Sequence, residues 1–231
     1  MELFSGAEWQ AIGLSLRVSF WATLASMPVA VLVAYALARW RFPGRFLLNI
    51  LVHLPLVLPP VVTGYLLLVT FGTRAPIGAF LEQAFGITFA FRWTGAAMAA
   101  AIMAFPLLVR AIRLSIEAVD RRLEAAAGTL GAPPFWVFAT ITMPLILPGV
   151  VAGAVLGFAK AMGEFGATIT FVSNIPGETQ TIPTAIYALL QVPGAEAPAA
   201  RLIAVSIALS VGALIVSEVL ATRATRRVEG R

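Results

Sequence analysis

The chain consists of long apolar stretches separated by short polar segments that are rich in arginine. A helix needs about 20 largely apolar residues to cross the hydrocarbon core of a membrane. Five stretches approach or exceed that length, roughly 11–38, 46–71, 93–109, 145–162 and 202–220. They lack the alternation of barrel strands. The pattern therefore predicts an all-α polytopic membrane protein with about five transmembrane helices in one domain, 1–231.

The composition excludes an ordinary water-soluble domain. Hydrophobic residues make up 60% of the chain and charged residues 12%, whereas soluble domains average about 25% charged residues. The net charge of +5 does not indicate a nucleic-acid-binding protein, because the basic residues lie between apolar stretches and not on one face. The chain has no cysteine, which excludes disulfides and thiolate chemistry.

The basic residues are distributed unequally between the two sides of the predicted membrane domain. Eleven of the 16 lie on one side: Arg39, Arg41, Arg45, Arg110, Arg113, Arg121, Arg122, Arg223, Arg226, Arg227 and Arg231. Because short cytoplasmic loops carry the excess of lysine and arginine, this side is expected to be cytoplasmic. The N-terminus is then outside, the C-terminus is cytoplasmic, and the loop at about 113–144 faces the cytoplasm.

That loop contains an amphipathic pattern between Glu117 and Gly131. The apolar residues Val119, Leu123, Ala127 and Leu130 recur at spacings of four, four and three, as on one face of a helix. Gly131 is placed to end the helix, and Pro133 and Pro134 cannot continue it. The pattern alone leaves two interpretations open: a connector that lies on the lipid headgroups, or a helix that contacts a partner.

The segment "EAAAGTLGAPPFWVFATITMP" resembles the cytoplasmic EAA loop of binding-protein-dependent ABC importer permeases. The signature of that loop is Glu-Ala-Ala, three residues, Gly, nine residues, Ile, one residue and Leu-Pro. The positions in register are Ala126, Ala127, Gly131, Ile141 and Pro144. Two positions depart from the signature: Ala125 takes the glutamate position, with Glu124 one residue earlier, and Met143 replaces the leucine.

Further blocks extend the resemblance over essentially the whole chain. "RFPGR", "HLPLVLPPVVTGYLLLV", "FPLLVRAIRLSIEAVDRRLE" and "GEFGATITFVSNIPGETQTIP" resemble permease subunits of bacterial molybdate ABC transporters. The first and third blocks also resemble sulfate and tungstate permeases, which leaves those anions as alternatives.

The resemblance implies a fold like that of type I ABC importer permeases, in the bacterial inner membrane. It implies a homodimer with the substrate path at its interface, two ATP-binding subunits and an external molybdate-binding protein. The loop at 117–144 would dock into the ATP-binding subunit. The residues expected to take part are Val119, Arg121, Leu123, Glu124, Ala126, Ala127, Leu130, Gly131, Ile141 and Pro144. Because the chain lacks a G-x-x-x-x-G-K-[ST] loop, no cofactor is expected on it, and ATP and Mg²⁺ would bind the partner.

The segment "KAMGEFGA" is a candidate part of the substrate path. Lys160 and Glu164 are four residues apart, which places them on one helical face. Ionisable residues in transmembrane helices often mark pathways, although Lys160 could instead extend to the surface or pair locally with Glu164. Residues 163–180 and the short apolar segment 182–192 are expected to fold back as an outer gate. Its candidate residues are Lys160, Gly163, Glu164, Gly166 and Asn174.

Three prolines, Pro55, Pro59 and Pro60, interrupt the second apolar stretch. Proline removes a backbone hydrogen bond and kinks a helix, so we expect either a static bend or a hinge. Arg17 is expected to pack between helices or to lie at the membrane interface, and not to contact substrate. The one histidine, His53, has no carboxylates near it in sequence and is a poor metal ligand. No catalytic or metal-binding residues are predicted, which disfavours an intramembrane enzyme, and a stand-alone channel would not need the docking loop.

Overall fold

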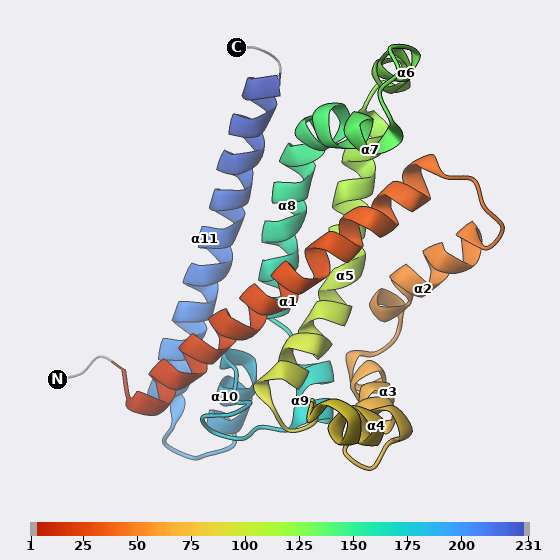
Figure 1. The fold of residues 1–231 in the computed structure, drawn as a ribbon. Helices are drawn as coiled ribbons and strands as arrows, with labels where there is room; N and C mark the ends of the chain where they lie inside the picture. The colour runs from red at the N-terminus through yellow and green to blue at the C-terminus, as the bar shows by residue number, and fades with distance from the viewer. Residues whose placement is uncertain (1–3, 229–231) are drawn as a thin grey trace.

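The computed structural model describes residues 4–228, and all regular elements among them are helical (Figure 1). The elements are α1 (Gly6–Arg39), α2 (Arg45–Val57), α3 (Pro60–Phe71), α4 (Pro76–Phe85), α5 (Trp93–Ala118), α6 (Arg121–Thr129), α7 (Pro134–Val137), the π-helix η1 (Phe138–Thr142), α8 (Met143–Met162), α9 (Gly166–Val172), α10 (Ile182–Leu189) and α11 (Glu196–Val228).

The predicted membrane-spanning architecture is confirmed. Within residues 4–228, four helical segments are long and apolar enough to span a membrane: α1, α5, the continuous segment Pro134–Met162, and α11 over Glu196–Val219. A fifth span results if α2 and α3 are counted together. The third span is longer than its apolar stretch, because α5 continues beyond residue 109 to Ala118.

The second apolar stretch forms two helices at an angle of 114° to each other, and not one kinked helix. The break lies at Leu58, whose backbone is extended. A residue before proline avoids the helical conformation, and the next residue is Pro59. Pro60 then occupies the first turn of α3, where proline is tolerated. Pro55 lies inside α2 without ending it, so the two later prolines determine the break.

Helices α1, α5 and α8 form the centre of the molecule, with α1 running obliquely along the other two (Figure 1). Small residues let α8 approach α5 closely. A side chain at Gly149 would overlap Ser115, and one at Gly157 would overlap Leu108. Such close approach is the main source of helix association in membranes, where lipid tails are as apolar as the helices. The core of this contact includes Leu108 and Ile112, both fully buried.

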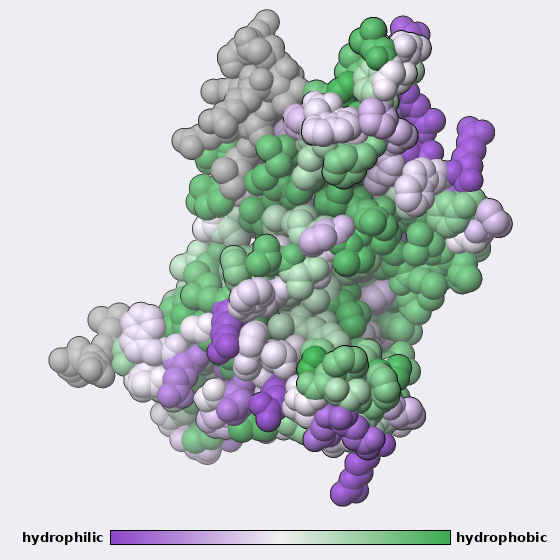
Figure 2. Space-filling model, in the orientation of Figure 1, coloured by the Kyte–Doolittle hydropathy of each residue, from purple (hydrophilic) through white to green (hydrophobic). Residues whose placement is uncertain are grey.

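The polar residues are gathered towards two opposite ends of the molecule, and a broad hydrophobic band lies between them (Figure 2). One end, which we call the α6 end, contains α6, α7 and the last turns of α1, α5 and α11 (Figure 1). The other, the α10 end, contains α4, α9, α10 and the start of α1. Arg45 stabilises the α6 end by donating hydrogen bonds to the Leu37 carbonyl at 2.6 and 3.1 Å. Arg231, one of the C-terminal arginines used to predict the orientation, lies outside the described residues.

Candidate functional site

The predicted loop helix is shorter than its sequence pattern indicated. The chain leaves α5 at Val119, which has an extended backbone. The Asp120 carboxylate accepts a hydrogen bond from the Arg122 backbone N–H at 2.9 Å. Aspartate is a strong helix N-cap, so it starts a new helix, α6. The prediction of one helix from Glu117 to Gly131 is therefore wrong, because this cap divides it.

One side of α6 is apolar and exposed. Leu123 is 49% exposed and Leu130 is 88% exposed, and Ala126 between them is exposed as well. Val119 does not share this face: it precedes the helix and is buried against α5. Ala127 is half buried. The face that we call the α6 face is therefore Leu123, Ala126 and Leu130, which corrects the four-residue set predicted from spacing.

Two aromatic residues that the sequence analysis missed lie just beyond α6. Phe135 and Trp136, in α7, are 73% and 58% exposed. Their rings meet edge to face with centroids 6.3 Å apart. Large exposed apolar residues next to the α6 face are typical of a protein contact surface. Their position directly after Pro133 and Pro134, at the first turn of a new helix, was the signal that could have identified them.

Gly131 ends α6, as predicted. Its φ of +87° is in the left-handed region, which residues other than glycine and asparagine rarely adopt. The Gly131 N–H donates to the Gly128 carbonyl at 3.0 Å, and the Ala132 N–H donates to the Ala127 carbonyl at 3.2 Å. A side chain at Gly131 would have nothing within 4 Å, so backbone conformation and not space requires glycine here.

Glu124 lies on the side of α6 that faces the rest of the protein. One of its carboxylate oxygens is 3.2 Å from Nε of Arg39, the last residue of α1. The other accepts a hydrogen bond from the Thr142 hydroxyl at 2.8 Å. Its side chain is 17% exposed. Glu124 thus joins α6 to α1 and η1 and does not contribute to the α6 face.

The second half of the loop leads into the membrane through an irregular helix. In η1 the Met143 N–H donates to the Phe138 carbonyl, five residues earlier. Thr142 is fully buried, Ile141 is half buried and Pro144 is exposed in the first turn of α8. Wide turns of this kind are frequent at functional sites. Of the two signature positions, Ile141 therefore lies within the wide turn and Pro144 lies just after it, at the start of α8.

A second break between helices lies at the α10 end. α8 ends at Met162, and Lys160 in its last turn is paired with Glu164 at 3.0 Å. Glu164 also accepts a hydrogen bond from the Ala167 N–H at 3.1 Å, so it caps α9. The local pair of Lys160 and Glu164, one of the alternatives that the sequence left open, is present, but Glu164 lies beyond the end of α8 and not on the same helix. The glutamate is 2% exposed and the lysine 33%.

The other candidate gate residues flank this break. Gly163 is exposed at the end of α8, and Gly166 packs so closely on Pro60 that a side chain there would overlap it. The Asn174 side-chain oxygen is buried, and no hydrogen-bond partner for it is found among residues 4–228. The geometry brings Lys160, Glu164 and Gly166 together, whereas Asn174 lies beyond α9.

Two polar residues within apolar helices have packing contacts. The Arg17 guanidinium lies 3.8 Å from the centre of the Trp93 ring, so it joins α1 to the start of α5, as predicted. His53 lies within hydrogen-bond distance of the Asn49 carbonyl in its own helix, 2.8 Å away. Both contacts satisfy a polar group by local packing.

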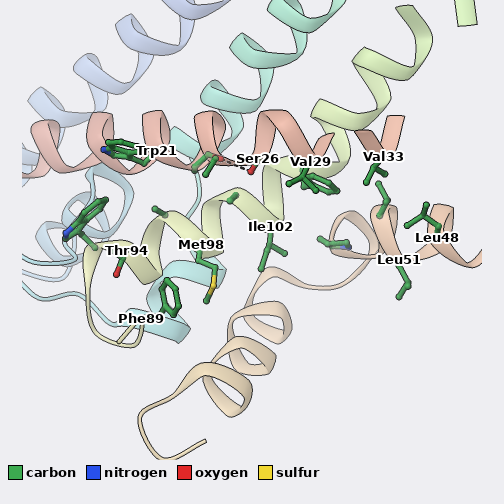
Figure 3. A pocket seen from close by; sticks show the side chains of 18 residues that line it. Trp21, Ser26, Val29, Val33, Leu48, Leu51, Phe89, Thr94, Met98 and Ile102 are labelled. Carbon is green, nitrogen blue, oxygen red and sulfur yellow. Dashed lines mark hydrogen bonds between the residues drawn. The ribbon is translucent and has the colours of Figure 1, made fainter. Parts of the chain in front are cut away.

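A cavity of about 710 Å³ lies between α1, α2 and α5. Figure 3 shows Trp21 and Val29 on α1, Leu48 and Leu51 on α2, and Met98 on α5 pointing into it. Among residues 4–228 no ionisable side chain lines it, and the hydroxyl of Ser26 donates to a carbonyl of its own helix. An anion would need positive charge or several hydrogen-bond donors. The other side-chain donors in the lining are the indole N–H groups of Trp21 and Trp93 and the Thr94 hydroxyl, so this mostly apolar cavity is poorly suited to hold one.

Comparisons with known proteins place the chain among transport proteins. The family described as "Binding-protein-dependent transport system inner membrane component" matches residues 26–226. The molybdenum transport system permease protein ModB of Escherichia coli K12 is 59% identical over 229 residues, which cover 99% of this chain and 100% of that protein.

A sulfate transport relative and a solved structure are also similar. The sulfate transport system permease protein CysT of Salmonella typhimurium is 35% identical, with 95% of this chain and 79% of that protein covered. A crystal structure of a bacterial ABC transporter involved in the import of alginate matches with a TM-score of 0.71 at 19% identity. It covers 96% of this chain and 80% of that chain.

Proposed function

The chain belongs to the family of binding-protein-dependent transport system inner membrane components, and we propose that it is the membrane-spanning permease of an ATP-driven molybdate importer. The observation that carries the substrate assignment is the 59% identity to the molybdenum permease, which extends over both chains in full. The chain is a transport subunit and not an enzyme. ATP and Mg²⁺ would bind a separate subunit.

The α6 face supports a docking site for that ATP-binding subunit. Leu123, Leu130, Phe135 and Trp136 form exposed apolar surface at the α6 end, the end of the molecule that also carries loop arginines such as Arg39 and Arg121. By the charge rule for membrane loops this end is cytoplasmic, where ATP is available. The N-terminus and α10 would then face outside, where an anion-binding protein would dock.

The functional assembly would contain two copies of this chain, with the substrate path at their interface. In each copy, the segment around Lys160, Gly163, Glu164 and Gly166 is the proposed outer part of the path. Lys160 is the only lysine of the chain, and its partial exposure beside a buried carboxylate is compatible with transient contact to an anion. The break between α2 and α3, at Pro59 and Pro60, is the proposed bend beside it, since Pro60 packs on Gly166.

Uptake by reconstituted vesicles tests this proposal. The chain would be inserted with its cognate ATP-binding subunit and anion-binding protein, and labelled molybdate uptake would be measured with ATP and with a non-hydrolysable analogue. We expect saturable uptake that requires hydrolysis. ATP-dependent uptake of sulfate without uptake of molybdate would instead support the second candidate, a sulfate permease, which the 35% identity to the sulfate protein favours.

A further inference from the structure

The end of α1 lies against the loop, although no short connection joins them. The loop connects α5 to α8, whereas α1 is followed by α2. Arg39, the last residue of α1, contacts Glu124 with Nε–Oε2 3.2 Å, and its guanidinium donates to the Val119 carbonyl at 3.1 Å. The two charged residues are 85 positions apart in sequence. This is a long-range contact between the first membrane helix and α6.

Both α1 and α6 donate hydrogen bonds in this contact, and its charged side chains are largely shielded from solvent. The Arg39 and Glu124 side chains are 8% and 17% exposed. In the opposite direction, the Arg121 guanidinium of α6 donates to the Ala38 carbonyl of α1 at 3.3 Å. Thr142 donates to the same carboxylate that binds Arg39. Removing one partner of such a pair leaves a buried charge uncompensated, which is far more damaging than the loss of a surface pair.

An aromatic contact adds to the polar one. Tyr35, one turn before Arg39, meets Phe138 of η1 edge to face with ring centroids 5.2 Å apart. It also meets Trp40, just after α1, at 6.0 Å. The end of α1 is therefore held at two places along the loop, by α6 and by η1. Two separated contacts fix the orientation of a helix as well as its position.

The opposite half of α1 is attached to the α10 end. The Ser15 hydroxyl accepts a hydrogen bond from the Ile182 backbone N–H, the first residue of α10, at 2.7 Å. Glu8 forms two bonds with Arg201 of α11 at 2.9 and 3.1 Å. Between Ser15 and Arg39 the helix is continuous, with Pro28 inside it, and it spans about 36 Å at 1.5 Å per residue.

We propose that α1 is a strut that carries displacement of α6 to α10, and that Glu124 is the positioning residue at its loop end. This inference rests on the proposed function, because it assumes that an ATP-binding subunit moves α6. It adds a third route to the two covalent ones through α5 and α8. The α6 face is left free for docking, so loss of Glu124 should impair transmission and not assembly.

Two variants separate transmission from assembly. Glu124→Ala removes the carboxylate without disturbing the helix, since alanine is the best helix former. The matched control is Glu82→Ala, which removes an exposed carboxylate from α4, far from the loop in sequence. Each variant is co-purified with the ATP-binding subunit, and molybdate uptake per ATP hydrolysed is measured in vesicles. We expect Glu124→Ala to assemble normally but to lose about tenfold in this ratio, and Glu82→Ala to match wild type.

A covalent replacement of the link provides the decisive measurement. The chain has no cysteine, so Arg39→Cys with Glu124→Cys creates one pair of thiols that a short bifunctional maleimide can join. Before cross-linking, this double variant should resemble Glu124→Ala. After cross-linking, uptake per ATP should recover, because α1 and α6 again move together.

Other results would overturn the inference. If cross-linking blocks uptake, α6 must leave α1 during the cycle, and the strut does not exist. The same conclusion follows if Glu124→Ala fails to bind the ATP-binding subunit, or keeps a normal uptake ratio. Failure of the wild-type chain to bind that subunit, in contrast, would overturn the proposed function together with the strut.

Discussion

At each end of the molecule a glutamate lies beside a break between two helices. Glu164 contacts only residues close to it in sequence, whereas Glu124 contacts two other elements of the fold. Glu164 binds Lys160 four residues earlier and the backbone of Ala167 three residues later. Glu124 binds Arg39, 85 residues away, and Thr142. The first glutamate shapes a local turn, whereas the second joins three elements. Disturbing them should therefore affect different steps: local geometry at the α10 end, and transmission at the α6 end.

The largest effect is expected at the α6 face itself. Leu123→Asp places a charge in the centre of the proposed docking surface, where a central apolar contact contributes 2 kcal/mol or more, or about 30-fold in affinity. Co-purification with the ATP-binding subunit should fall at least that much while membrane insertion is unchanged. Leu190→Asp is the control: it alters another exposed leucine, at the α10 end, which is 66% exposed against 49% for Leu123. Equal binding by both variants would contradict the docking assignment.

A strong effect is also expected from the residue that ends α6. Gly131→Pro cannot adopt φ of +87° and removes the N–H that donates to Gly128. It should displace α7 and reduce assembly nearly as much as Leu123→Asp. Gly131→Asn should retain most assembly, since asparagine tolerates the left-handed conformation. If the proline and asparagine variants assemble equally well, the conformation of this turn is not needed for docking.

An intermediate effect is expected at the α10 end. Lys160→Ala leaves the buried Glu164 without its cation, and molybdate uptake should fall roughly tenfold, as for the loss of a charged hydrogen bond. Binding of the ATP-binding subunit should not change, in contrast to Leu123→Asp. Lys160→Arg, which keeps the charge, should restore most uptake. Equal loss in the arginine and alanine variants would show that side-chain shape, and not charge, is what this break requires.

The smallest effect is expected from a second ion pair between residues far apart in sequence, which lies at the α10 end. Glu8 and Arg201 join α1 to α11, and the Arg201 side chain is 37% exposed. Because Arg201, the cation that Glu8→Gln would leave unpaired, is open to water and can be hydrated, this change should lower the thermal midpoint of the purified protein only slightly. Glu178→Gln, at an exposed carboxylate, should not change it. If Glu8→Gln lowered the thermal midpoint more than Glu124→Ala does, the proposed ranking of the two ends would be reversed.

The sequence predicted the helical class, the number of apolar spans and the stop at Gly131, and it left a local Lys160–Glu164 pair open as one alternative. These features depend on local properties: apolar length, backbone conformation and neighbouring charges. The break in the second span was predicted only as a kink. Three prolines indicate an interruption, but the direction of the chain after Leu58 depends on what α3 packs against, which includes Gly166 a hundred residues later.

The composition of the α6 face was predicted less well. Spacing grouped Val119 with Leu123 because it assumed an unbroken helix, and the capping role of Asp120 was overlooked. Spacing also could not show that Glu124 faces Arg39, because the partner of a buried charge is determined by tertiary structure. Arg39 was counted only as one of the residues that indicate orientation, although it is the residue that holds α6.

The π-helical turn before α8 affects how positions in this loop should be counted. Each i→i+5 turn uses one residue more than an α-helical turn for the same advance along the axis. An ordinary helical wheel continued through 138–142 would misplace the residues that follow the turn, from Met143 onward, by about 100°. The fixed interval between Gly131 and Pro144 in the signature therefore includes a π-helical turn. Inserting or deleting a single residue there would rotate the start of α8 relative to α6 and the end of α1.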